Sequence, residues 1–104
     1  MSEPVYFVAQ IDVKDYEAYL EEYGFPLLEQ LNVIGAEVLA ADPNFDVLEG
    51  DWGGNWMAII KFPSAAVATK FYASSEYAPL KDLRINKLSN RGAVVQVAGI
   101  PTGD

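Results

Sequence analysis

Residues 47–64 read VLEGDWGGNWMAIIKFPS, and this stretch decides how the rest of the chain must fold. It contains the end of one strand, a glycine-rich turn, and a second strand over 56–62 that is apolar at nearly every position. Pro63 and Ser64 follow as a stop signal and a helix N-cap. The segments before this stretch therefore lead into a sheet, and the segments after it return to one.

The N-terminal part of the chain predicts a strand followed by a bent helix. Apolar residues alternate over 5–13 and give a strand with one wholly apolar face and one mixed face. Asp15 is the expected N-cap of a helix that runs to about Asn32. Pro26 removes a backbone donor inside this helix, so the helix should bend or restart there.

The segments between this helix and the glycine-rich turn predict a second strand. Gly35 ends the helix, and a short strand over 36–41 follows, closed by a turn with the sequence Asp-Pro-Asn. Residues Phe45 to Glu49 can pair back on this strand or extend it. Whether they pair within one chain or between two chains is left open.

The C-terminal part predicts two helical segments and a last strand. Ser64 caps the first helix, which Ser74 interrupts, and Pro79 lies in the first turn of the second helical segment. Asn90 to Gly92 should close this segment, and residues 93–98 should form the last strand.

The expected order of elements is β-α-β-β-α-β, the split βαβ arrangement of ferredoxin-like α+β folds. Residues 1–104 are expected to form one domain with a loose tail at 99–104. Both helices should cover the same face of an antiparallel sheet, over the wholly apolar faces of the strands. The opposite face should then carry Tyr6, Val8, Gln10, Met57, Ile59, Lys61, Val94, Gln96 and Ala98.

That opposite face is too apolar to be left in water. A second copy of the chain laid sheet against sheet would cover it, so we expect a two-fold homodimer that can enclose a pocket between its subunits.

Composition and charge exclude several classes of protein. Hydrophobic residues make up 51% of the chain and charged residues 21%, which excludes intrinsic disorder. A net charge of -8 argues against a nucleic-acid partner, because binding to phosphates depends on Lys and Arg. The acidic residues crowd the first half of the chain and several basic residues lie late, so we expect ion pairs between the halves or between subunits.

Hydropathy and residue usage exclude further classes. The longest apolar run, 56–60, is far shorter than the roughly 20 residues of a membrane helix, and the N-terminus does not resemble a secretory signal. We therefore expect a soluble, cytoplasmic protein without a membrane partner. The chain has no Cys and no His, so disulfides, zinc-thiolate sites, haem-ligating imidazoles and the usual neutral-pH base are missing. No metal and no cofactor are therefore expected.

Four residues are candidates for catalytic roles. Glu49 and Asp51 flank a glycine and can converge on a cleft, although capping is an alternative role. Lys61 points to the mixed face, where loss of water can lower its pKa; the alternative is a solvated lysine. Arg84 begins a stripe with Lys87 and Arg91 at helical spacing that can hold a carboxylate or phosphate, or simply face the acidic half.

A second set of residues is expected to contact a ligand. Gln10 and Gln96 share the mixed face in the predicted register and can hydrogen-bond a small molecule, or one another. Tyr23 lies on an apolar stripe, where a core role with a satisfied hydroxyl is the alternative. The full predicted ligand-binding set is Tyr6, Gln10, Trp52, Met57, Gln96 and Tyr23.

Four segments together resemble the domain-of-unknown-function 1330 family. They are VLEGDW at 47–52, IIKFPS at 59–64, FYASSEY at 71–77 and LKDLR at 80–84. The resemblance implies the dimeric α+β barrel, a superfamily that also contains cofactor-free monooxygenases, lactone isomerases and haem enzymes, and it implies no known reaction. The chain departs from the family at Lys61, where an acid is frequent, and at Gly35-Ala36, where Gly-Gly is frequent.

Three functions follow as hypotheses. The first is an uncharacterised dimer that binds a small apolar or aromatic molecule between its subunits. The second is a non-catalytic structural or accessory dimer whose interface is filled by its own side chains. The third is a cofactor-free monooxygenase or isomerase-like enzyme, and the sequence leaves open whether the chain is an enzyme.

Overall fold

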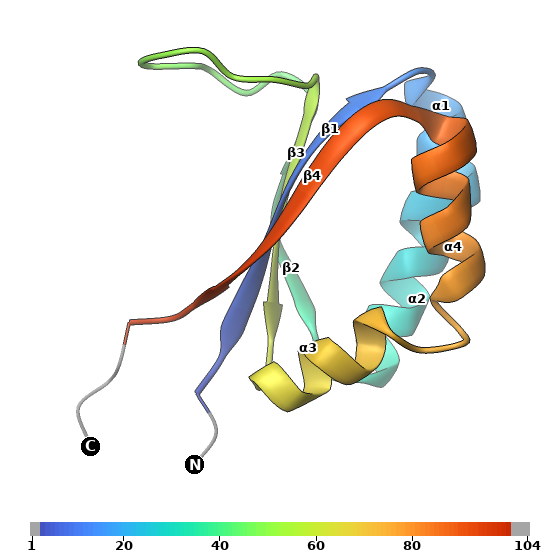
Figure 1. The fold of residues 1–104 in the computed structure, drawn as a ribbon, viewed down its shortest axis with the longest axis vertical. Helices are drawn as coiled ribbons and strands as arrows, with labels where there is room; N and C mark the ends of the chain where they lie inside the picture. Colours follow the sequence, from blue (N-terminus) through green and yellow to red (C-terminus); the bar gives the residue numbers. More distant parts are fainter. Residues whose placement is uncertain (1–2, 101–104) are drawn as a thin grey trace.

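The computed structural model describes residues 3–100, which form an α+β fold with a four-stranded antiparallel sheet (Figure 1). The sheet has the strand order β2-β3-β1-β4. The strands are β1 (Val5–Val13), β2 (Glu37–Asp42), β3 (Trp56–Phe62) and β4 (Ser89–Ala98). The strands expected over 5–13 and 56–62 are thus confirmed to the residue.

The helices form three segments, and all of them lie on the same side of the sheet (Figure 1). The first segment joins α1 (Tyr16–Tyr19), the π-helical turn η1 (Leu20–Gly24) and α2 (Phe25–Val33). The second is α3 (Ala65–Tyr72). The third joins α4 (Ala78–Leu83) and the π-helical turn η2 (Arg84–Leu88).

The local signals for helix starts are confirmed. The Asp15 carboxylate accepts a hydrogen bond from the backbone N–H of Ala18 at 3.2 Å, and the Ser64 hydroxyl accepts one from the N–H of Val67 at 3.1 Å. The helix does not break near Pro26, because Gly24 and Phe25 both keep helical backbone angles. The π-helical turn η1 changes directly into α2 there, and the proline lies in the first turn of α2.

Two predicted segments differ from the structure. The last strand begins at Ser89, four residues earlier than expected. Residues Asn90 to Gly92 were expected to end the helix, but they belong to β4, because β4 pairs with β1 as far as Val13. Residues Phe45 to Glu49 form no strand. They belong to a long loop, residues 43–55, which projects away from the sheet and is called the arm below (Figure 1).

The predicted tail lies mostly outside the described residues, which end at Ile100. Gly99 still belongs to the body of the fold, because its backbone N–H donates to the Pro4 carbonyl at 3.2 Å.

The pairing of β1 with β4 corrects the predicted faces of the sheet. Phe7 lies opposite Gln96 and Val8 lies opposite Val95. Val94, Gln96 and Ala98 therefore lie on the face with the helices, and Ala93, Val95 and Val97 lie on the other face, called the open face below. The prediction was wrong because the side-chain period of a strand is two, so a single step in register inverts every position.

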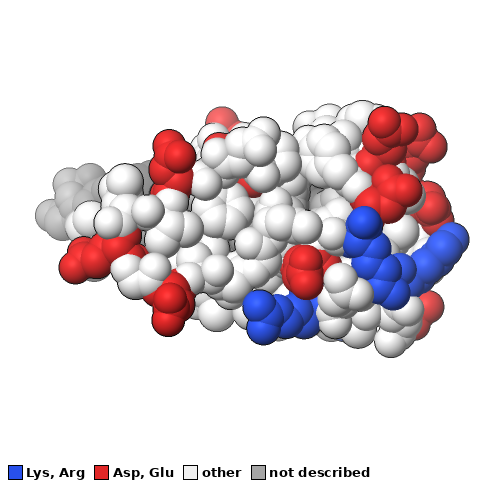
Figure 2. Space-filling view, turned by 90° about the horizontal axis from the view of Figure 1, so that it is seen from above, with Lys and Arg blue, Asp and Glu red and all other residues white. Residues whose placement is uncertain are grey.

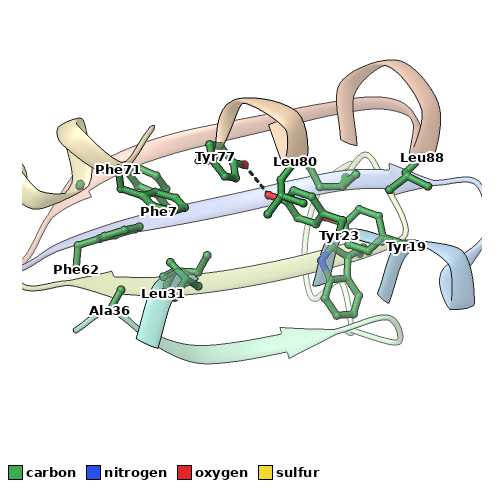
Figure 3. Close-up of a cluster of buried hydrophobic side chains, with 14 of the residues drawn as sticks. Phe7, Tyr19, Tyr23, Leu31, Ala36, Phe62, Phe71, Tyr77, Leu80 and Leu88 are labelled. Atoms are coloured by element: carbon green, nitrogen blue, oxygen red, sulfur yellow. Dashed lines mark hydrogen bonds between the residues drawn. The ribbon is translucent and has the colours of Figure 1, made fainter. Parts of the chain in front are cut away.

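The core lies between the sheet and the helices and is rich in aromatic rings (Figure 3). The rings of Phe7 and Phe62 are 4.4 Å apart between centroids, and Phe71 of α3 lies 4.6 Å from Tyr77. Figure 3 also shows Tyr19 and Tyr23 projecting from the first helical segment into the same layer. Among residues 3–100, no helix has the length and apolar content needed to cross a bilayer.

Candidate functional site

A cavity of about 170 Å³ lies between the sheet and the helices. Its floor comes from the helix-side residues of the strands, including Phe7, Ala58 and Ile60, and its roof includes Tyr19, Tyr23 and Leu27 of the first helical segment. These walls are apolar and aromatic, which is the usual lining of a small-molecule pocket.

Arg84 is the charged residue among the side chains that line this cavity. It is only 5% exposed, and its Nε–H has no hydrogen-bond partner among the described residues. The residue opens the π-helical turn η2, and the hydroxyl of Ser89 donates to its backbone carbonyl at 2.5 Å. Tyr23 also lies in a π-helical turn, a local structure that often occurs at functional sites.

Two tyrosine hydroxyls accompany the arginine. The hydroxyl oxygens of Tyr23 and Tyr77 are 2.6 Å apart and form a buried hydrogen bond (Figure 3). The guanidinium carbon of Arg84 lies 6.0 Å from the centre of the Tyr23 ring, at the outer limit of a cation–π contact. The cavity therefore combines one positive charge, a pair of phenols and apolar walls.

The protonation states of these groups follow from burial and proximity. Burial raises the pKa of Tyr19, and burial followed by the neighbouring Tyr77 raises the pKa of Tyr23. Burial lowers the pKa of Arg84, but the phenolic groups of Tyr23 and Tyr77 raise it more strongly, so its pKa lies above the ordinary value. At neutral pH the arginine is a cation, and Tyr19 and Tyr23 are neutral phenols.

The predicted site residues of the sheet lie mainly on the open face, away from this cavity. Tyr6, Gln10 and Met57 all lie there, and half-buried Lys61 stands between Tyr6 on β1 and Glu37 on β2. Gln96 lies on the opposite face.

The shared face predicted for Gln10 and Gln96 was therefore wrong. The cause is the register of β4, because Gln10 lies opposite Ala93 and Gln96 lies opposite Phe7.

The predicted residues of the arm are exposed. Asp51 and Trp52 border a hollow on the open-face side together with Gln10 and Arg91. Glu49 is exposed elsewhere on the arm and does not line this hollow. The structure thus brings Gln10, Asp51 and Trp52 together, apart from the cavity that holds Arg84 and Tyr23.

The basic helical stripe is corrected by the structure. Arg84 points into the cavity, Arg91 belongs to β4, and Lys87 forms an ion pair with Glu22 at 2.8 Å. That ion pair joins the late basic residues to the acidic first half, as the alternative interpretation predicted. Seen from above, acidic groups lie toward both ends of the molecule, and uncharged atoms cover most of the middle (Figure 2).

Several cavity residues were missed by the sequence analysis. Tyr19 lies one helical turn before Tyr23 and packs its ring 5.9 Å from that of Trp56. The available signal was the helical spacing of Tyr19 and Tyr23. Tyr23 was predicted to contact a ligand, whereas Tyr19 was assigned only to the apolar stripe. Within residues 3–100, no group of three or more acidic side chains is placed to hold a metal ion.

The fold and the cavity define a class: small α+β proteins with an apolar pocket between one face of an antiparallel sheet and the helices that cover it. The chain belongs to the family described as domain of unknown function (DUF1330), whose model matches residues 4–99. The predicted family resemblance is thereby confirmed.

Solved structures share this fold at low sequence identity. The methylated RPA0582 protein is 14% identical, with a TM-score of 0.77, over 100% of this chain and 86% of that chain. The RPA0582 protein from Rhodopseudomonas palustris, described as a protein of unknown function, is 15% identical, with a TM-score of 0.76, over 97% and 85%. No curated protein matches the chain.

Proposed function

We propose that the protein binds one small apolar or aromatic molecule in the cavity beneath its helices. The cavity itself is the observation that carries this proposal: it measures about 170 Å³ and has apolar, aromatic walls. An apolar cavity of about 150 Å³ is enough to admit benzene. This proposal moves the binding site from the subunit interface, where the sequence analysis expected it, to the helix side of the sheet.

Benzyl alcohol is a suitable first probe, because it offers one ring and no charge. Binding should raise the midpoint of thermal unfolding, since a ligand that binds only the folded state stabilises it by mass action. The variant Ala58→Leu places a larger side chain in the cavity floor and should abolish this shift. The matched control Met57→Leu changes the adjacent residue of β3, which lies on the open face, and should leave the shift unchanged.

Native mass spectrometry of the purified protein gives an independent measurement. A bound small molecule in the wild type that is lost from Ala58→Leu would identify the natural ligand. Equal thermal shifts in the wild type and in Ala58→Leu would contradict the proposal, because the probe would then bind outside the cavity.

We also propose that the chain has the ferredoxin-like arrangement of a dimeric α+β barrel and pairs with a second copy across the open face. The strand order β2-β3-β1-β4 supports the arrangement. The open face supports the pairing, because Val95 is 57% exposed and Val97 48% exposed there. The arm adds exposed Leu48 and Trp52. Burial of this apolar surface against a second copy would remove it from water.

The binding proposal assigns ligand contact to Tyr23 and Arg84 and does not depend on turnover. A catalytic role for Lys61, Glu49 or Asp51 would need a separate reaction site, on the open face or on the arm, where these residues lie.

A further inference from the structure

Arg84 is a buried positive charge without a carboxylate partner. Among the described residues, the ion pair that forms is between Lys87 and Glu22, and no acidic side chain lines the cavity. Burying a charge costs free energy unless the charge is paired and hydrogen-bonded. A negative charge in the cavity would supply this missing partner.

The polar groups around Arg84 in the cavity also have more hydrogen-bond donors than acceptors. The Nε–H of Arg84 is buried and unpartnered. The Tyr23 and Tyr77 hydroxyls carry two protons, but their mutual hydrogen bond uses only one of them. The guanidinium group and the second phenolic proton therefore call for an acceptor, and a carboxylate matches the fork of an arginine with two oxygens.

The remaining walls restrict the rest of the ligand. Apart from Arg84, the tyrosine hydroxyls and the indole N–H of Trp56, the lining is apolar, so it matches one negative charge on an otherwise hydrophobic body. The volume of about 170 Å³ leaves room for one ring or a short branched chain.

A route for an anion is present at the edge of the cavity. Tyr72, Arg84 and Val94 line both the cavity and a second hollow at the surface beside the start of β4. No acidic residue lines that hollow, and the guanidinium of Arg91, which also borders it, lies beside Gly53 of the arm. This approach to Arg84 therefore presents no negative charge to an incoming carboxylate.

We propose that the ligand is a monocarboxylate with a single aromatic ring or a short branched alkyl body, bound with its carboxylate at Arg84 and its body against the aromatic walls. This inference rests on the proposed function, because it names the chemical class of the molecule in the same cavity.

Isothermal titration of the wild-type protein with benzoate, benzamide and acetate tests the inference without any substitution. Benzoate and benzamide have the same shape but differ in charge, and acetate has the charge without the ring. Benzoate should bind roughly ten- to a hundredfold more tightly than benzamide, as expected for charge-assisted hydrogen bonds. Acetate should bind more weakly than benzoate, because it leaves the apolar walls uncovered.

Substitutions then locate the charge. Arg84→Met keeps an apolar side chain of similar length and should remove the preference for benzoate over benzamide. Arg84→Lys keeps the charge but loses the planar fork, and should retain part of the preference. Arg91→Gln is the matched control at an exposed arginine and should change the affinity for benzoate by less than about threefold, as expected for a screened surface charge.

The outcomes separate the two proposals. Benzamide binding as tight as benzoate binding, or an unchanged benzoate preference in folded Arg84→Met, would overturn the carboxylate inference and leave the proposed function standing. Absence of binding by benzoate, benzamide and benzyl alcohol would overturn the proposed function and the inference with it.

Discussion

At the scale of single residues, the contact between Tyr23 and Tyr77 shows how this core holds polar atoms. The two hydroxyl oxygens lie 2.6 Å apart, inside a layer of aromatic rings (Figure 3). In this bond one hydroxyl donates and the other accepts, and burial keeps Tyr23 protonated by raising its pKa. The pair joins η1 to the start of α4, and so it links two helical segments that are far apart in the sequence.

Removing either hydroxyl alone should destabilise the protein by more than half of the loss caused by removing both. Tyr23→Phe and Tyr77→Phe should each lower the free energy of unfolding by about 1–3 kcal/mol, because the remaining hydroxyl loses its partner in a buried site. The double variant should lose less than the sum of the two single losses, since neither hydroxyl is then left unpaired.

Urea unfolding of the wild type and of these three variants measures the cycle. Strictly additive losses would show that the two hydroxyls do not interact.

At the scale of elements, contacts between the C-terminal end of the arm and β1 fix the position at which the arm leaves the sheet. The Asn55 side chain accepts from the N–H of Val13 at 2.8 Å and donates to the carbonyl of the same residue at 3.0 Å, which continues the pairing of β1 beyond the strand. Gly54, just before it, has a φ of 87° and lies against the backbone of Ile11. This close approach fixes where the arm leaves the sheet.

A side chain at Gly54 should be poorly tolerated. In Gly54→Ala the new Cβ would lie 2.7 Å from the Ile11 carbonyl oxygen. The matched control is Gly50→Ala, which has a φ of 81° but no atom within 4 Å of the new Cβ. Gly50→Ala should cost about 1–2 kcal/mol from backbone strain alone. Gly54→Ala should cost about 1–3 kcal/mol more, because the clash is with backbone that has to move.

Chemical unfolding of both variants, followed by tryptophan fluorescence, measures this difference. Equal losses would show that the contact with Ile11 does not restrict the arm.

At the scale of the whole molecule, the sheet has one covered face and one open face. The helices occupy one side only (Figure 1), and the open face carries Val8, Ile59, Val95 and Val97 in neighbouring strands. The proposed second copy would cover these residues. The ligand cavity lies on the other side of the sheet, so assembly and ligand binding can be altered separately.

A lysine on the open face should therefore separate the subunits. Val95→Lys puts a charge on the proposed interface, whereas Gln96→Lys puts the same charge on the next residue of β4, which lies on the helix side. Light scattering after gel filtration should give a dimer for the wild type and for Gln96→Lys, and a monomer for Val95→Lys. A wild type that is monomeric at every concentration would contradict the proposed pairing.

Much of this fold is predictable from sequence because its signals are local. Alternating apolar residues fix the strands 5–13 and 56–62, and the caps at Asp15 and Ser64 act on donors only three residues away. The position of Pro26 in the first turn of α2 follows from its missing backbone N–H. These features depend only on residues that are close together in the sequence.

The tertiary structure decided what depends on distant partners. The faces of β4 are set by pairing with β1, more than 75 residues earlier in the chain, and an edge strand with apolar residues on both faces does not encode that register by itself. The position of Arg84 follows from the packing of η2 over the sheet beside Tyr23 and Tyr77. A helical pattern places an arginine on a face, but the cavity beside it exists only when three helical segments and the sheet close around the same space.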